Sequence, residues 1–122
     1  VEDTLEAHPD IVYIIGTAVT AEAAVGLLRA RGLSDKIKII SYYFTPGVFR
    51  GIKRGQILAA PTDSTVIQGR VAVDQAVRLL EGLDLFKHVG PELYVVDQSN
   101  ITSFDRGAAL APNGFKPTFA VD

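Results

Sequence analysis

Four short runs rich in β-branched residues recur along the chain, and stretches with helical periodicity separate them. The runs are Ile11–Ile15, Ile37–Ser41, Gln56–Ala60 and Leu93–Val96. Consecutive runs lie too far apart for hairpins, and strands that alternate with helices are typical of parallel βαβ units. The first run is apolar throughout, as expected of a strand covered on both faces. The sequence therefore predicts an α/β fold with a parallel sheet flanked by helices on both faces.

The stretches between the runs carry helix start signals. Thr20 is a candidate N-cap for a helix over about residues 20–31. Thr45, followed by Pro46, predicts the start of a shorter helix, because an amide at the first helical position has no intrahelical partner and its loss is harmless. A third helix is expected over about residues 64–81, where apolar residues recur at spacings of three and four.

The length of 122 residues fits one domain with a single core. We expect one lobe over residues 1–122, in which residues 98–122 form a crossover or tail segment. Phe104, Phe115 and Phe119 predict that this segment covers a surface. The chain does not begin with methionine and contains none, which indicates a piece of a longer protein.

Composition narrows the classes of function. The net charge is -2, and the lysines and arginines are dispersed, so a nucleic-acid-binding surface is not expected. No apolar run approaches the roughly 20 residues that cross a bilayer, which predicts no membrane insertion. The absence of cysteine excludes disulfides, thiolate metal ligands and a cysteine nucleophile.

Signals for catalysis, cofactors and metals are weak. The loop after the first run holds one glycine, Gly16, where a dinucleotide-binding fingerprint needs three. His8 and His88 are isolated histidines, and neither forms a recognisable triad pattern with Ser64. We therefore expect a protein that is not an enzyme and has no cofactor or metal site, and a small α/β enzyme is the alternative from another class.

Ligands of open parallel sheets meet the loops that follow the carboxyl ends of the strands. The loops after the first three runs span residues 16–19, 41–45 and 61–64. The middle loop holds Tyr42, Tyr43 and Phe44 in succession, and because neighbours alternate sides, Tyr43 can face a ligand while one neighbour packs inward. We expect ligand contacts from Tyr43, Tyr42, Thr17 and Asp63. The alternatives are that the three aromatics are core or interface residues and that Asp63 caps the following helix.

Three stretches of the chain resemble the second lobe of type I periplasmic binding proteins, the ribose-binding class. They are His8–Ile11, Lys38–Ser41 and above all Thr45–Gly55. The resemblance covers essentially the whole chain, and it implies one of two similar α/β lobes that close on a small solute. Sugar binders of this family have an aspartate where this chain has Tyr43, which disfavours a polyol ligand.

A narrower resemblance is to the periplasmic sensor of the trimethylamine N-oxide respiratory system. Four stretches carry it, namely Pro9–Ile14, Gly47–Gly51, Ala60–Asp63 and Phe115–Phe119. The resemblance implies a periplasmic protein that binds trimethylamine N-oxide and signals to the periplasmic domain of a membrane sensor histidine kinase. That partner belongs to a two-component system that regulates anaerobic respiration.

The chemistry of this ligand agrees with the residue types in the middle loop. Trimethylamine N-oxide has a methylated, electron-poor nitrogen and an acceptor oxygen, which suit an aromatic face and a hydroxyl donor. Tyr43 offers both groups. Two alternatives share the fold, a periplasmic sugar or amine solute-binding protein for transport and a LacI-type effector-binding domain.

Overall fold

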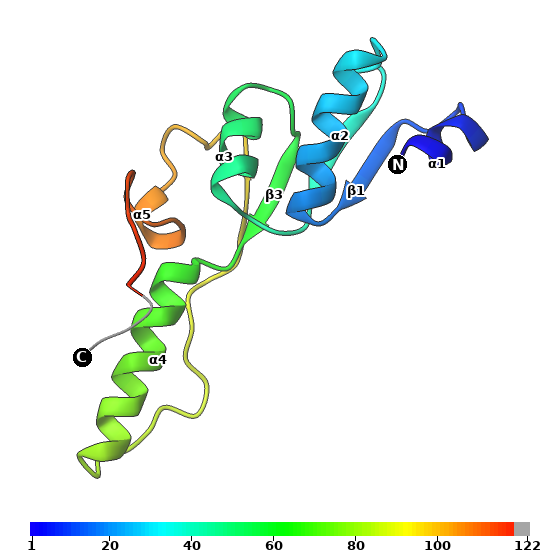
Figure 1. Cartoon of the computed structure of the whole chain (residues 1–122). Helices are drawn as coiled ribbons and strands as arrows, with labels where there is room; N and C mark the ends of the chain where they lie inside the picture. Colours follow the sequence, from blue (N-terminus) through cyan, green and yellow to red (C-terminus); the bar gives the residue numbers. More distant parts are fainter. Residues whose placement is uncertain (119–122) are drawn as a thin grey trace.

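The computed structural model describes residues 1–118, in which helices and strands alternate (Figure 1). The elements are α1 (Glu2–Ala7), β1 (Tyr13–Gly16), α2 (Ala18–Ala30), β2 (Lys38–Ser41), α3 (Pro46–Lys53), β3 (Ala59–Thr62), α4 (Thr65–Leu80), β4 (Tyr94–Asp97) and α5 (Arg106–Ala109). The sheet is mostly parallel and is flanked by helices, so the predicted α/β class is confirmed.

The four strands form one sheet in the order β1-β2-β3-β4. β1 pairs in parallel with β2, and β2 pairs in parallel with β3 through Ile40 and Ala59. β4 pairs antiparallel with β3, so the prediction of a fourth parallel strand was wrong. The reason is that α4 projects away from the sheet and the following segment returns beside it, so the chain re-enters the sheet at the end where β3 left it (Figure 1).

The core lies between the sheet and the pair of helices α2 and α3. Small residues on α2, Ala21 and Ala24, are buried and let the helix approach the strands closely. On α3, a Cβ atom at Gly51 would lie 2.6 Å from Cδ1 of Ile57, so only glycine allows this approach. On the opposite face of β1, Ile15 is exposed.

Two helix starts test the predicted caps. Thr17, rather than Thr20, is the N-cap of α2, because its Oγ1 accepts a hydrogen bond from the Thr20 amide at 3.3 Å. Thr45 is confirmed as the N-cap of α3, since its Oγ1 accepts a hydrogen bond from the Val48 amide at 3.1 Å. Each cap satisfies an amide that has no partner inside the helix.

The third strand begins later than predicted. It covers Ala59–Thr62 instead of residues 56–60. The amides of Gln56 and Ile57 both donate to the carbonyl of Gly51, at 2.9 and 3.2 Å, and so close the carboxyl end of α3. Residues that close a helix end in this way are not available for pairing with β2.

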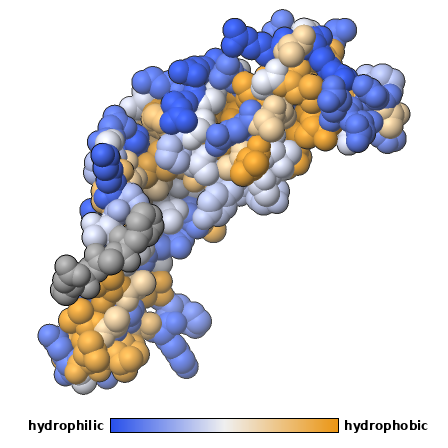
Figure 2. All heavy atoms as spheres, viewed as in Figure 1, coloured by the Kyte–Doolittle hydropathy of each residue, from blue (hydrophilic) through white to orange (hydrophobic). Residues whose placement is uncertain are grey.

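Helix α4 has no buried residue, although its sequence is amphipathic. The segment after it packs along one side, where the Phe86 amide donates to Oε1 of Gln75 at 3.0 Å. The Arg78 guanidinium lies 4.6 Å from the centroid of the Phe86 ring. Hydrophobic side chains gather over the far part of α4 (Figure 2) and include Val77 and Leu80, which the described residues leave exposed.

The carboxyl-terminal segment covers a surface through one of its phenylalanines. Phe104 packs against the core, as predicted, whereas Phe115 is exposed. Phe119 lies outside the described residues. The crossover into this segment is a turn after β4, in which the Ile101 amide donates to the Asp97 carbonyl at 2.9 Å.

A matched pair of leucines tests this distribution of burial. Leu28 is 1% exposed and Leu80 is 86% exposed. We expect Leu28→Ala to lower the free energy of unfolding by about 2–5 kcal/mol, because it removes packed methyl groups and leaves a cavity, and Leu80→Ala to change it by less than about 0.5 kcal/mol. Urea unfolding of the 122-residue chain measures both. Equal losses would contradict the exposed position of α4.

Candidate functional site

The loops that follow β1, β2 and β3 meet at one edge of the sheet, as the parallel pairing requires. Gly16 and Ser41 are register partners at the ends of β1 and β2. The Tyr42 amide donates to the Gly16 carbonyl at 2.9 Å, which extends the pairing into the two loops. Thr17 and Tyr42 are therefore brought together, and Asp63 follows the end of β3 at the same edge.

The three consecutive aromatics divide between this edge and the core. Tyr42 is 58% exposed and Tyr43 is 54% exposed, whereas Phe44 is 7% exposed. The Phe44 ring makes edge contacts with Phe49 and Phe104, at centroid distances of 6.3 and 5.2 Å. Phe44 is thus the neighbour that packs inward, and the two tyrosines are not core residues. Ligand contact by either tyrosine stays a prediction.

Ser41 fixes the bend that presents Tyr43. Its side chain is fully buried, and its Oγ donates to the Tyr43 carbonyl at 2.7 Å and accepts from the Tyr43 amide at 3.2 Å. Sequence reasoning did not select this residue. The available signal was a serine at the end of an apolar strand, where short hydroxyl side chains commonly bond to nearby backbone.

Asp63 stands at the junction between the sheet and α4. Its Oδ1 accepts a hydrogen bond from the Thr65 hydroxyl at 3.0 Å, so it does not cap a backbone amide of the helix. Ser64 occupies the N-cap position without a side-chain capping bond, and its φ of 53° lies in the left-handed region. A non-glycine residue in this region is strained and persists where surrounding contacts impose it.

Thr17 already has a structural role. Its hydroxyl contacts the Thr20 hydroxyl at 3.1 Å in addition to capping α2. These bonds account for a threonine at this position without a ligand. Of the four predicted contact residues, Thr17 and Asp63 are held by hydrogen bonds within the chain, whereas the rings of Tyr42 and Tyr43 are exposed.

Sequence reasoning missed Tyr94, which the antiparallel β4 carries to the same edge. Tyr94 is the register partner of Thr62, the last residue of β3. Its ring lies 5.9 Å from the Phe104 ring in an edge arrangement. The sequence of this strand carries no signal that would have identified Tyr94. In a parallel fourth strand, Tyr94 would lie at the opposite edge of the sheet.

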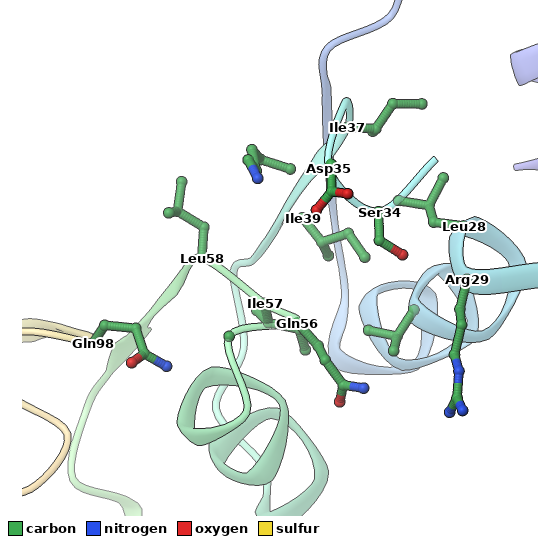
Figure 3. A pocket seen from close by; sticks show the side chains of 13 residues that line it. Leu28, Arg29, Ser34, Asp35, Ile37, Ile39, Gln56, Ile57, Leu58 and Gln98 are labelled. Carbon is green, nitrogen blue, oxygen red and sulfur yellow. The ribbon is translucent and has the colours of Figure 1, made fainter. Parts of the chain in front are cut away.

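The best-formed cavities of residues 1–118 lie away from this edge, which is open. One cavity, of about 230 Å³, lies at the opposite end of the sheet and is lined by Leu28, Arg29 and Gln56 among others (Figure 3). None of Thr17, Tyr42, Tyr43 and Asp63 lines any of them. The described residues therefore do not enclose this edge.

Two shifted pKa values also belong to groups away from this edge. Hydrogen bonds from the hydroxyl and amide of Ser99 lower the pKa of Asp97, at the far end of β4 from Tyr94. Hydrogen bonds to Glu6 and Glu2 raise the pKa of Arg31, which follows the carboxyl end of α2.

Within residues 1–118 no cluster of three or more His, Asp or Glu side chains could hold a metal ion. No helix in the same range is long and apolar enough to span a bilayer.

Comparison with protein families and curated proteins gives two findings. A family described as periplasmic binding proteins and sugar binding domain of the LacI family matches residues 1–107. The periplasmic protein TorT of Escherichia coli K12 is 37% identical over 118 residues, which are 97% of this chain and 34% of TorT. The chain thus spans about a third of the length of the curated relatives that it matches.

Solved structures with the same arrangement include two of high similarity. An ABC transporter solute-binding protein from Bradyrhizobium sp. BTAi1 with bound bis-tris is 60% identical, with a TM-score of 0.88 over 98% of this chain and 36% of that one. A complex of the TorS sensor domain with TorT in the presence of trimethylamine N-oxide matches at 33% identity and TM-score 0.88, over 97% and 40% of the chains. A solute-binding protein from Agrobacterium vitis with D-fucose, at 22% identity and TM-score 0.77 over 89% of this chain and 38% of that one, shows the fold alone.

The contacts of Ser41 predict that its hydroxyl fixes the backbone of the loop that carries Tyr42 and Tyr43. We expect Ser41→Ala to speed hydrogen exchange of the Tyr43 amide and to lower the free energy of unfolding by about 1–3 kcal/mol, because the buried backbone bonds lose their partner. Ser103→Ala, which removes an exposed hydroxyl, is the control and should change stability by less than about 0.5 kcal/mol. Unchanged protection of the Tyr43 amide in Ser41→Ala would contradict this role.

Proposed function

The chain belongs to the family of periplasmic binding proteins and LacI-type sugar-binding domains, and we propose that it forms one wall of a ligand cleft in a periplasmic binding protein. The ligand is a small methylated amine oxide, trimethylamine N-oxide. The cleft lies at the edge where Tyr42, Tyr43 and Asp63 follow the parallel strands. The protein binds its ligand and catalyses no reaction on it.

The proposal rests on the exposed tyrosine pair beside an anchored phenylalanine. Aromatic rings that stay exposed at the carboxyl edge of a parallel sheet, while the next residue is held in the core, suit a ligand with a methylated, electron-poor nitrogen. The Tyr43 hydroxyl is a donor for the ligand oxygen. Asp63 follows β3 at the same edge, and a carboxylate there suits the positive end of the ligand dipole.

Typical interaction energies indicate how much of the binding free energy this wall of the cleft contributes. A methylated cation against an aromatic face gains about 0.5–2 kcal/mol, whereas micromolar affinity requires about 8 kcal/mol in all. One or two tyrosines therefore supply a minority of the binding free energy. The remaining contacts come from the part of the polypeptide that matches the other two thirds of the relatives' length.

The two most informative relatives bind or accompany compounds with a common chemical feature. Trimethylamine N-oxide is present with the TorT complex, and bis-tris is bound to the Bradyrhizobium protein. In both compounds a nitrogen carries three carbon substituents and has oxygen-bearing groups near it. This common feature supports a site for a substituted amine.

For the biological role we propose sensing, since the TorT relative is found in complex with the TorS sensor domain. The partner is the periplasmic domain of a sensor histidine kinase, and closure of the cleft on the ligand changes the surface that the kinase reads, which regulates anaerobic respiration. The second candidate is solute uptake, because the 60% identical relative is an ABC transporter solute-binding protein. Ligand-dependent binding to a kinase sensor domain, measured beside binding to a transporter, separates the two.

Paired substitutions test the site in a polypeptide of the relatives' full length that carries this chain. We expect Tyr43→Ala to weaken binding of trimethylamine N-oxide about 5- to 30-fold, because a cation–aromatic contact and a hydroxyl donor are lost. Tyr42→Ala is the comparison variant, and its expected loss is smaller than that of Tyr43→Ala, because neighbouring residues alternate sides and only one of the two rings faces the ligand. Isothermal titration calorimetry, with a pentose as the comparison ligand, measures both.

The outcomes of this titration are distinct. Equal losses in the two variants would show that Tyr43 is not the residue facing the ligand. Tight binding of a pentose and none of trimethylamine N-oxide would contradict the proposed ligand class.

A further inference from the structure

The antiparallel direction of β4 gives the candidate edge a residue from a fourth element. Tyr94 begins β4 and pairs with Thr62, so it lies at the edge where the parallel strands end. Asp97 ends β4 at the opposite side of the sheet. A strand that entered in parallel would have exchanged these two positions.

The register places Tyr94 and Tyr43 on either side of β3. Tyr43 lies in the loop after β2, which pairs with one side of β3, and Tyr94 begins β4, which pairs with the other side through Thr62. Neighbouring strands are about 4.8 Å apart, so β2 and β4, which flank β3, are separated by about 10 Å. A cation interacts with an aromatic ring within about 6 Å of the ring centroid. This spacing of the two strands is compatible with one methylated nitrogen between a ring from each side.

The Tyr94 ring and Phe44, the residue after Tyr43, belong to one aromatic layer. The Tyr94 ring packs edge-on against Phe104 at 5.9 Å, and Phe104 packs against Phe44, the residue after Tyr43, at 5.2 Å. This layer fixes the two sides of the site relative to each other. Rings that are held before the ligand arrives lose little conformational entropy on binding.

The burial of β4 shows that Tyr94 is not simply a core residue. Val96 lies two residues further along the same face and is fully buried, whereas Tyr94 is 38% exposed. The Tyr94 hydroxyl makes no hydrogen bond to another described residue. The ring packs against Phe104, and part of the residue stays exposed.

We propose that Tyr94 contacts the ligand and, together with Tyr43, forms a pair of aromatic walls that selects a methylated nitrogen over a polyol. This inference rests on the proposed function, because it assigns a further residue to the same site. A methylated ammonium gains from the negative face of each ring, whereas a sugar hydroxyl has no comparable attraction. The second wall is thus a determinant of specificity.

A graded series of ring substitutions tests the contact in the full-length protein. Tyr94 is replaced by phenylalanine and then by trifluorophenylalanine, which keeps the shape of the ring but weakens the negative charge of its face. We expect Tyr94→Phe to bind trimethylamine N-oxide within about 3-fold of the unmodified protein, and the fluorinated ring to bind about 5- to 30-fold more weakly than Tyr94→Phe. The same series at Tyr13, an exposed tyrosine at the other end of β1, is the control.

Calorimetry and thermal unfolding together distinguish a ligand contact of Tyr94 from a packing effect. A loss with the fluorinated ring at Tyr94 alone, with an unchanged melting temperature, supports the contact. A flat Tyr94 series in a protein that binds trimethylamine N-oxide overturns the role of Tyr94 and leaves the proposed function intact. Equal losses at both positions with a lower melting temperature indicate packing only and also overturn it. Absence of binding by the unmodified protein overturns the proposed function together with this inference.

Discussion

Burial of the Phe44 ring between Phe49 and Phe104 is the interaction on which the candidate site depends. It draws the loop after β2 down onto the core, and the two preceding tyrosines stay exposed as a consequence. The buried Ser41 hydroxyl completes this anchor by bonding both polar groups of the Tyr43 backbone. A single hydrophobic contact thus connects the core to the edge where ligands of parallel sheets bind.

Much of the fold could be predicted because it follows from local rules. Apolar periodicity and end signals located α2, α3 and α4 to within a few residues, and Thr45 with Pro46 marked the start of α3. One error has a local cause, and the other arises from tertiary contacts. β3 starts late because the amides before it close α3 on Gly51, and the direction of β4 depends on where α4 and its return segment lie. Neither contact has a counterpart in the pattern of a single run.

The residues of the candidate site also divide into those that the sequence predicts and those that it does not. Tyr42, Tyr43 and Asp63 were predictable at one edge because the carboxyl ends of parallel strands must meet there. Tyr94 was not predictable, since its place at that edge requires the antiparallel pairing with Thr62. The capping role of Thr17 was missed for a local reason, namely that two threonines three residues apart both fit a helix start.

The central claim is that a methylated nitrogen lies against the Tyr43 ring at the carboxyl edge of the sheet. Intermolecular nuclear Overhauser effects between the methyl protons of trimethylamine N-oxide and selectively labelled tyrosine rings of the full-length protein test it most directly. The account predicts contacts to the Tyr43 ring and none to Tyr13, at the opposite end of β1. Bound trimethylamine N-oxide whose methyl protons contact Tyr13, or no ring at this edge, would contradict it.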